Sequence, residues 1–170
     1  MSTGRGRASV SGMADVELTV RVRYHEVDRM GIAYHPRYLT WFELARVELL
    51  RGAGLPYTAL EAAGTGLPVI RSETHHKRPL GFDEEFTVEC TVGEVGGARL
   101  RLDYRALRGG ELVAEGCTEH AAVDLATMRP RRLPAELREA LARLPSQGGD
   151  LPVHRSSDPL DASLATPGAP

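Results

Sequence analysis

The sequence predicts an α+β domain in which one long helix lies against a mainly antiparallel sheet. Several segments alternate apolar and polar residues with a period of two, which is typical of strands that bury one face. One segment, residues 36–51, instead has a helical period with a wide apolar face, and it lies between the first strand and the others. Because the later strands follow one another through short turns, we expect an antiparallel meander on which the helix packs.

Each strand is identified by its alternation and by the turn beside it. The first has apolar side chains at every second position from Leu18 to Tyr24. A weaker strand is closed by Pro79, because proline cannot donate to a sheet ladder. The sequence GEVGG joins the third and fourth strands as a hairpin. Gly109-Gly110 forms the next turn, and most of the fifth strand follows it. The five strands are expected within residues 18–24, 67–79, 86–92, 100–106 and 107–125.

The long helix is expected to begin at Pro36, whose missing N–H would have no helical partner there, and to end near Gly52 or Gly54. So wide an apolar surface indicates a largely buried helix. The residues expected to form this surface are Tyr38, Trp41, Phe42, Leu44, Ala45, Leu49 and Leu50. A second, shorter helix is expected from Pro134 to about Leu144.

The composition is that of one globular domain. The chain has 170 residues, of which 42% are apolar and 26% charged, and its formal net charge of -2 gives no general attraction to nucleic acid. No stretch approaches the ~20 apolar residues that span a bilayer, so we expect no membrane insertion and a cytoplasmic location. Cys90 and Cys117 lack metal-ligand spacing and are interpreted as small buried hydrophobic residues.

Both ends of the chain differ in composition from the middle. Residues 1–13 are rich in Gly, Ser and Arg, and residues 145–170 are dense in Pro, Ser, Gly and Asp with little periodicity. Such composition favours disorder. We therefore expect one folded domain over residues 14–144, and Met13 is an alternative start because ordered patterning begins only after it.

The most unusual stretch is YHEVDRMGIAYHPRYLTWFELAR, residues 24–46, which crowds ionisable and turn-forming residues before the helix. A metal site would need converging ligands, but His25 and Glu26 continue a predicted strand and should point to opposite faces. Their spacing also matches no zinc motif, so no metal is expected. Signatures of a G-x-S-x-G nucleophile and of phosphate-binding loops are missing from the sequence.

The remaining candidate for a catalytic site combines a carboxylate with the N-terminus of the long helix. Asp28 follows the first predicted strand in a tight connection, shortly before the long helix. Because Pro36 has no N–H and biases His35 toward an extended conformation, the His35 amide is a donor without a helical partner. Such an amide can hold an oxyanion while a nearby carboxylate attacks or activates water. From the residues alone, Asp28 is at least as well interpreted as a turn or cap residue.

The segment RVRYHEVDRMGIAYHPRYLTWFELARVELLR resembles the first motif of the hotdog-fold acyl-CoA thioesterases, in the branch of 4-hydroxybenzoyl-CoA thioesterase and the Tol-Pal-associated short-chain acyl-CoA thioesterases. The resemblance covers roughly residues 16–128. It rests on the ordered string Tyr24, Glu26, Asp28, Gly31, Tyr34-His35, Tyr38-Leu39, Phe42-Glu43 and Ala45-Arg46. It implies an antiparallel sheet wrapped around a long central helix, and a homodimer or homotetramer with the site at a subunit interface.

The resemblance also implies roles for particular residues. Asp28 matches the aspartate that acts as nucleophile or general base, and His35 matches the position whose amide is the oxyanion donor and whose side chain belongs to the site. The implied substrate-binding residues are Tyr24, Gly31, Tyr34, Tyr38 and Glu43. Glu43 has an ordinary alternative as the i,i+3 ion-pair partner of Arg46, which we favour.

Coenzyme A carries phosphates, so cationic side chains are expected near the mouth of the site. The candidates are Lys77, Arg78, Arg99, Arg101 and Arg129, although for any single one of them we favour a solvated strand face. Two features depart from the family: Arg37 replaces the asparagine usual in YHxNY, and His75-His76 stand where apolar or aromatic residues are common. His76 either lines the pocket or lies on a solvated strand face, and we favour the latter.

The leading functional hypothesis is hydrolysis of an acyl-CoA thioester without a metal or redox cofactor. An acyl carrier protein conjugate is an alternative substrate. A hydratase or dehydratase on the same fold would instead pair a histidine with an acidic residue, and a non-catalytic acyl-CoA-binding protein would keep the fold without the chemistry. The sequence leaves open the acyl chain length, aromatic against aliphatic preference, and dimer against tetramer.

Overall fold

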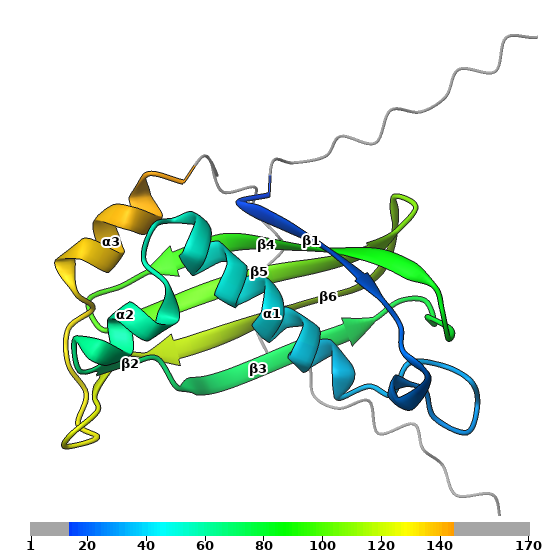
Figure 1. The fold of residues 1–170 in the computed structure, drawn as a ribbon, viewed down its shortest axis with the longest axis horizontal. Helices are drawn as coiled ribbons and strands as arrows, with labels where there is room; N and C mark the ends of the chain where they lie inside the picture. The colour runs from blue at the N-terminus through cyan, green and yellow to red at the C-terminus, as the bar shows by residue number, and fades with distance from the viewer. Residues whose placement is uncertain (1–13, 145–170) are drawn as a thin grey trace, which may run out of the picture.

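The computed structural model describes residues 14–144, which form a curved antiparallel sheet with a long helix across one face (Figure 1). The strand order is β1-β4-β5-β6-β3, and every neighbouring pair is antiparallel. The strands are β1 (Val16–Arg21), β3 (Val69–His76), β4 (Glu85–Val95), β5 (Arg99–Arg108) and β6 (Glu111–Ala121). The predicted α+β class is confirmed. The tails predicted for residues 1–13 and 145–170 lie outside the described residues.

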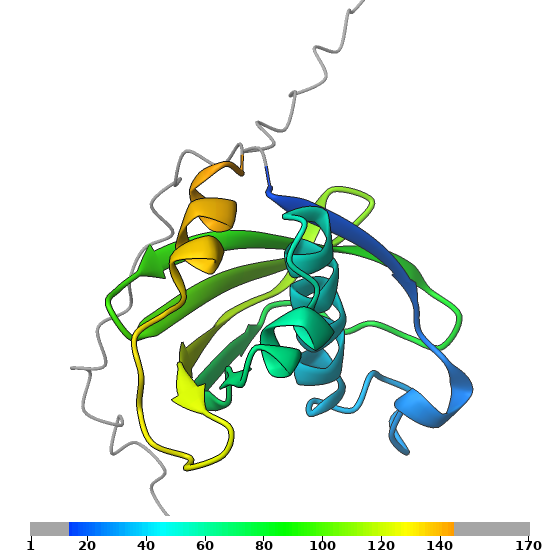
Figure 2. The same cartoon turned by 60° about the vertical axis from the view of Figure 1, so that its left-hand side comes forward.

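The long helix α1 (Arg37–Gly52) lies in the concavity of the sheet, which curves around it (Figure 2). The side of the helix that faces the sheet is buried, as its apolar period predicts. Its buried residues are Tyr38, Trp41, Phe42, Ala45, Leu49 and Leu50. Leu44, which we expected on this buried surface, is 48% exposed. That expectation is wrong because the sheet covers only one side of the helix.

Close packing between α1 and the sheet depends on a glycine in β6. The ring of Phe42 stacks on Tyr104 with centroids 4.4 Å apart and planes 6° from parallel. Beside it, a Cβ atom on Gly116 would lie 2.9 Å from Cε2 of Phe42 and would also collide with the Glu73 carbonyl of β3. Gly116 therefore allows both the neighbouring strand and the helix to approach. Cys90 and Cys117 are buried and unpaired, as predicted.

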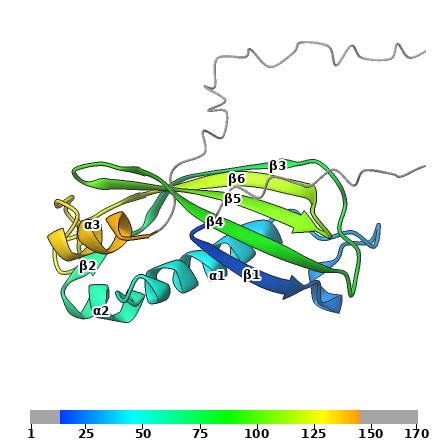
Figure 3. The same cartoon turned by 90° about the horizontal axis from the view of Figure 1, so that it is seen from above.

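Three short elements were not predicted: α2 (Tyr57–Ala62) and the paired strands β2 (Thr65–Gly66) and β7 (Val123–Asp124). Segments this short carry too few residues for a period to be recognised. They lie with the C-terminal helix α3 (Ala135–Ala142) at one end of the sheet, opposite the segment between β1 and α1 (Figure 3). Among the described residues, no helix is long and apolar enough to cross a membrane.

The first strand is shorter than predicted. It stops at Arg21, and Tyr24 belongs to the 3-10 helix η1 (Tyr24–Glu26). The buried side chain of Glu26 explains the change, since its two oxygens accept from the Arg23 amide at 2.8 Å and from Nε1 of Trp41 at 3.2 Å. A helical turn lets one carboxylate satisfy both donors, and this tertiary bond overrides the alternation.

Candidate active site

The segment between β1 and α1 folds back on itself at one end of the sheet. Val27 pairs with Ala33 in an antiparallel bridge, and Ile32 pairs with Gly81 from the loop between β3 and β4. The amide of Ala33 also donates to the carbonyl of Leu80, 2.7 Å away. These bonds place the turn after Val27, the start of α1 and the loop before β4 side by side.

Asp28 opens this turn. Its Oδ1 accepts from the amide of Met30 at 2.8 Å, and its backbone carbonyl accepts from Gly31 at 3.0 Å, where the chain turns with a φ of 76°. The turn role predicted for Asp28 is therefore present. Within residues 14–144 no group donates to the second carboxylate oxygen, Oδ2. One oxygen of this half-buried carboxylate fixes its orientation, and the other is left for water or substrate.

The start of α1 leaves one amide unused. Arg37 donates to the carbonyl of Tyr34 at 2.8 Å and Tyr38 donates to the carbonyl of His35 at 3.3 Å, while Pro36 has no N–H. Among the described residues nothing accepts from the amide of His35, as the sequence predicts. This amide is therefore free to donate to a ligand. The exposed His35 ring contacts the Tyr34 ring edge-on, with centroids 4.9 Å apart.

Tyr38, whose amide donates to the His35 carbonyl, is almost fully buried. Its ring meets Trp41 at 5.0 Å and His76 at 4.7 Å between centroids, both edge-on. Burial raises the pKa of Tyr38 to about 12, so the phenol stays protonated at neutral pH. The contact also shows that His76 points toward α1. His76 is nevertheless exposed, so the solvated position that we favoured is present together with the contact to Tyr38.

Exposed aromatic side chains flank the turn. Tyr24 is 79% exposed and packs edge-on against Phe82, which is 55% exposed, with centroids 5.6 Å apart. Met30, on the turn itself, is 75% exposed. Sequence reasoning named Tyr24 but missed Phe82, which lies directly after Gly81 and comes to the site only through the Ile32–Gly81 bridge. Apolar side chains so gathered and so exposed are typical of a binding surface.

Two other acidic residues near the turn have protein partners. Glu26 is tied to Trp41 and does not face solvent, and within residues 14–144 no group of three or more His, Cys, Asp or Glu side chains could hold a metal ion. Glu43 lies 3.9 Å from Arg46, so the predicted ion pair is present. The Glu43 side chain is 63% exposed, on the face of α1 away from the sheet.

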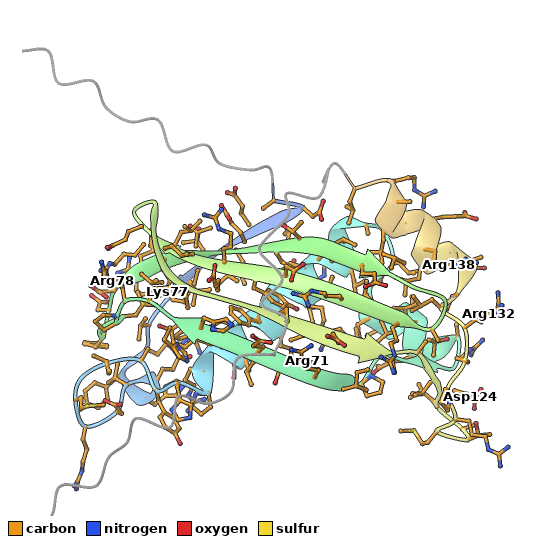
Figure 4. All side chains as sticks on the ribbon, turned by 180° about the vertical axis from the view of Figure 1, so that it is seen from behind. Arg71, Lys77, Arg78, Asp124, Arg132 and Arg138 are labelled. Atoms are coloured by element: carbon orange, nitrogen blue, oxygen red, sulfur yellow. The ribbon has the colours of Figure 1, made fainter. Side chains whose placement is uncertain are left out.

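The cationic residues predicted to bind coenzyme A do not converge. Lys77 and Arg78 follow β3 at the Asp28 end, where each pairs with a glutamate of β6, at 3.0 Å and 3.3 Å. Arg99 begins β5 opposite the far end of β6, and Arg101 pairs with its neighbour Asp103 at 2.8 Å. Figure 4 shows Lys77 and Arg78 together at one end of the sheet, with Arg132 and Arg138 at the other. Of the predicted residues, Lys77 and Arg78 lie at the end of the sheet that holds the candidate site.

Comparison with known proteins identifies the family. The sequence pattern of the thioesterase-like superfamily matches residues 22–141. A relative named acyl-CoA thioesterase YbgC, from Haemophilus influenzae, is 33% identical over 126 residues, which are 74% of this chain and 93% of the relative.

Solved structures agree with the sequence comparison. A hypothetical protein from Thermus thermophilus, TT1821, is 36% identical with a TM-score of 0.72, and the match covers 75% of this chain and 98% of that one. The DHNA-CoA thioesterase of Staphylococcus aureus is 30% identical with a TM-score of 0.71, covering 74% and 87%. The architecture is therefore the hotdog fold, and the chain belongs to the thioesterase-like superfamily.

Proposed function

We propose that this chain hydrolyses an acyl-CoA thioester, with Asp28 as nucleophile or general base and the His35 amide as oxyanion donor. One observation carries the proposal: within residues 14–144 a carboxylate oxygen and a backbone amide, both without partners, flank one turn at the start of α1. The name of the Haemophilus influenzae relative supports the substrate class. The resemblance of the motif supports the finer placement in the 4-hydroxybenzoyl-CoA and Tol-Pal-associated branch.

Two routes are compatible with this geometry. In the first, the Asp28 carboxylate attacks the thioester carbon, the C–S bond breaks, and the coenzyme A thiolate takes a proton from solvent; water then hydrolyses the acyl-aspartyl anhydride. In the second, Asp28 removes a proton from water, the resulting hydroxide attacks the carbon, and the thiolate leaves as before. In both, negative charge develops on the carbonyl oxygen, where the His35 amide stabilises it.

The surrounding residues have binding roles in this proposal. The exposed rings of Tyr24 and Tyr34 contact the acyl or pantetheine chain. The buried Tyr38 packs next to the His35 segment and supports it. The positive φ of Gly31 keeps the Asp28 turn tight. Lys77 and Arg78 are the proposed partners of the phosphates of coenzyme A. An acyl carrier protein conjugate is the alternative substrate, and no metal or redox cofactor takes part. A cytoplasmic location stays a prediction.

The proposed assembly is a homodimer or homotetramer. β3 is an edge strand of the sheet, and it begins with Val69 and Ile70, which are 50% and 48% exposed. An edge of eight residues with apolar side chains favours pairing with another strand. Light scattering during gel filtration measures the mass. A monomer at micromolar concentration contradicts this part of the proposal.

The decisive experiment measures thiol release from short-chain, long-chain and aromatic acyl-CoAs by the wild type and by Asp28→Asn. The amide oxygen of asparagine can still accept from Met30, so the turn is expected to persist while the rate falls roughly 10²- to 10⁴-fold. Asp83→Asn, in the neighbouring loop, is the matched control, since Asp83 pairs with Arg21 and should not affect the rate.

Two results would contradict the proposal. If Asp28→Asn and the wild type are equally active, Asp28 has no catalytic role and only stabilises the turn. No thiol release from any thioester, including carrier-protein conjugates, contradicts hydrolysis itself and favours the binding or hydratase alternatives. Isotope from labelled water found in Asp28 after a single turnover distinguishes nucleophilic attack from general-base catalysis.

A further inference from the structure

His76 is a polar side chain beside the candidate site that no protein group uses. It is the last residue of β3, and its ring contacts Tyr38 edge-on, at an interplanar angle of 71°. Among the described residues nothing hydrogen-bonds to either ring nitrogen. The neighbouring His75 differs, because its Nε2 lies 2.7 Å from Glu73 on the opposite face of the strand.

The ring of His76 is accessible to a ligand. The side chain is exposed, and its ring packs on one side against the buried ring of Tyr38. The rest of the ring is therefore open to a ligand. The nitrogens of this exposed ring bond to water until a bound molecule displaces that water.

The charge state of the ring suits hydrogen bonding to a neutral group. Burial lowers the pKa of His76, and repulsion from His35 and then from His75 lowers it further. The imidazole is accordingly neutral at pH 7, with one N–H donor and one nitrogen acceptor. His76 also contacts Tyr38, whose amide donates to the His35 carbonyl at 3.3 Å. The unused imidazole is thus near the amide that would hold the thioester carbonyl oxygen.

We propose that His76 is a specificity-determining residue, whose imidazole hydrogen-bonds a hydroxyl or oxo substituent on the acyl group. This inference rests on the proposed thioester hydrolysis. An apolar acyl group would displace water from the ring without replacing its hydrogen bond, which costs affinity. A site that hydrogen-bonds a substrate hydroxyl rejects the analogue that lacks it. The site should therefore favour substituted acyl groups over unsubstituted ones of similar size.

The test compares kcat/KM within matched substrate pairs: 3-hydroxybutyryl-CoA with butyryl-CoA, acetoacetyl-CoA with butyryl-CoA, and 4-hydroxybenzoyl-CoA with benzoyl-CoA. In the wild type we expect a preference of roughly tenfold or more for the substituted member of at least one pair. His76→Phe keeps a ring against Tyr38 but removes both nitrogens, so the preference should fall to about one. His75→Phe, one residue away on the outer face, should keep it.

The outcomes separate this inference from the proposed function. Hydrolysis with the same ratios in wild type and His76→Phe for every pair overturns the role of His76 and leaves the thioesterase proposal standing. An equal loss of preference in His75→Phe also overturns it. No thiol release from any thioester overturns both. Thermal unfolding verifies that each variant is folded, and His76→Leu gives the same readout if the phenylalanine variant does not fold.

Discussion

Two groups of polar residues, one before the start of α1 and one beside its second half, differ in whether their atoms have partners. At its start, the Asp28 carboxylate, the His35 amide and the His76 ring keep hydrogen-bonding atoms without partners among the described residues. In its second half, Arg46 belongs to a buried cluster in which the polar groups bond to one another. Since a buried polar group without a partner costs free energy, the second cluster holds the fold together. In the proposed function, the first binds the substrate.

The second cluster also fixes the state of its histidine. Nη1 of Arg46 lies 3.0 Å from Nδ1 of His120, and Thr118 Oγ1 lies 2.8 Å from Nε2. Because arginine can only donate, Nδ1 accepts and the proton resides on Nε2, directed to Thr118. Nδ1 is also 3.1 Å from the Leu67 carbonyl, which already receives the Tyr57 hydroxyl at 3.2 Å. Protonating His120 would place an N–H against a guanidinium.

The largest expected difference between the halves is in stability. Phe42→Ala removes the ring that stacks on Tyr104 and packs over Gly116, and it should lower the free energy of unfolding by about 3–5 kcal/mol. Tyr24→Ala, at the exposed end, should change it by no more than about 0.5 kcal/mol. Urea unfolding measures both. Comparable losses would show that the site end also stabilises the fold.

Acidification should act on the buried cluster. Burial, and then the charge of Arg46, lowers the pKa of His120 from 6.5 to about 4. The unfolded chain therefore takes up the proton first as pH falls. The stabilisation is fully present above the ordinary pKa and is lost as pH falls toward 4, by about 2 kcal/mol between about pH 7.5 and about pH 5.

Urea unfolding at both pH values, in the wild type and in His120→Gln, isolates this contribution from that of the titrating carboxylates. The variant should be less stable at neutral pH but should lose less on acidification. Equal pH dependence of the two proteins would show that His120 is not the group responsible.

The smallest expected effect concerns Glu43. This residue is close to the site in the sequence, but in the structure its side chain forms an ion pair with Arg46. Glu43→Gln removes a mostly exposed pair with Arg46 and should change stability by a few tenths of a kcal/mol, with thiol release within about twofold of wild type. Steady-state assays beside Asp28→Asn measure this. A loss as large as that of the Asp28 variant would move the catalytic carboxylate onto the helix.

Much of the fold follows from local pattern, since the strands and α1 have clear periods and clear turns. The failures have tertiary causes: Glu26 bonds to Trp41 and ends β1 early, and Leu44 lies on the side of α1 that the sheet leaves uncovered. For the site, the unused His35 amide is predictable because Pro36 is its neighbour. The alternation of β3 put His76 on one face, but which face met α1 could not be read from it.

The sequence by itself determined the fold class, the buried face of α1 and the chemistry gathered between residues 24 and 46, because periods and turn residues act locally. Only the tertiary structure decided which polar groups keep free atoms. Lys77 and Arg78 came to the Asp28 end while Arg99 did not, and Phe82 joined Tyr24 from a distant loop. Partners of this kind are set by strand register and by contacts between segments far apart in the chain, which no local pattern encodes.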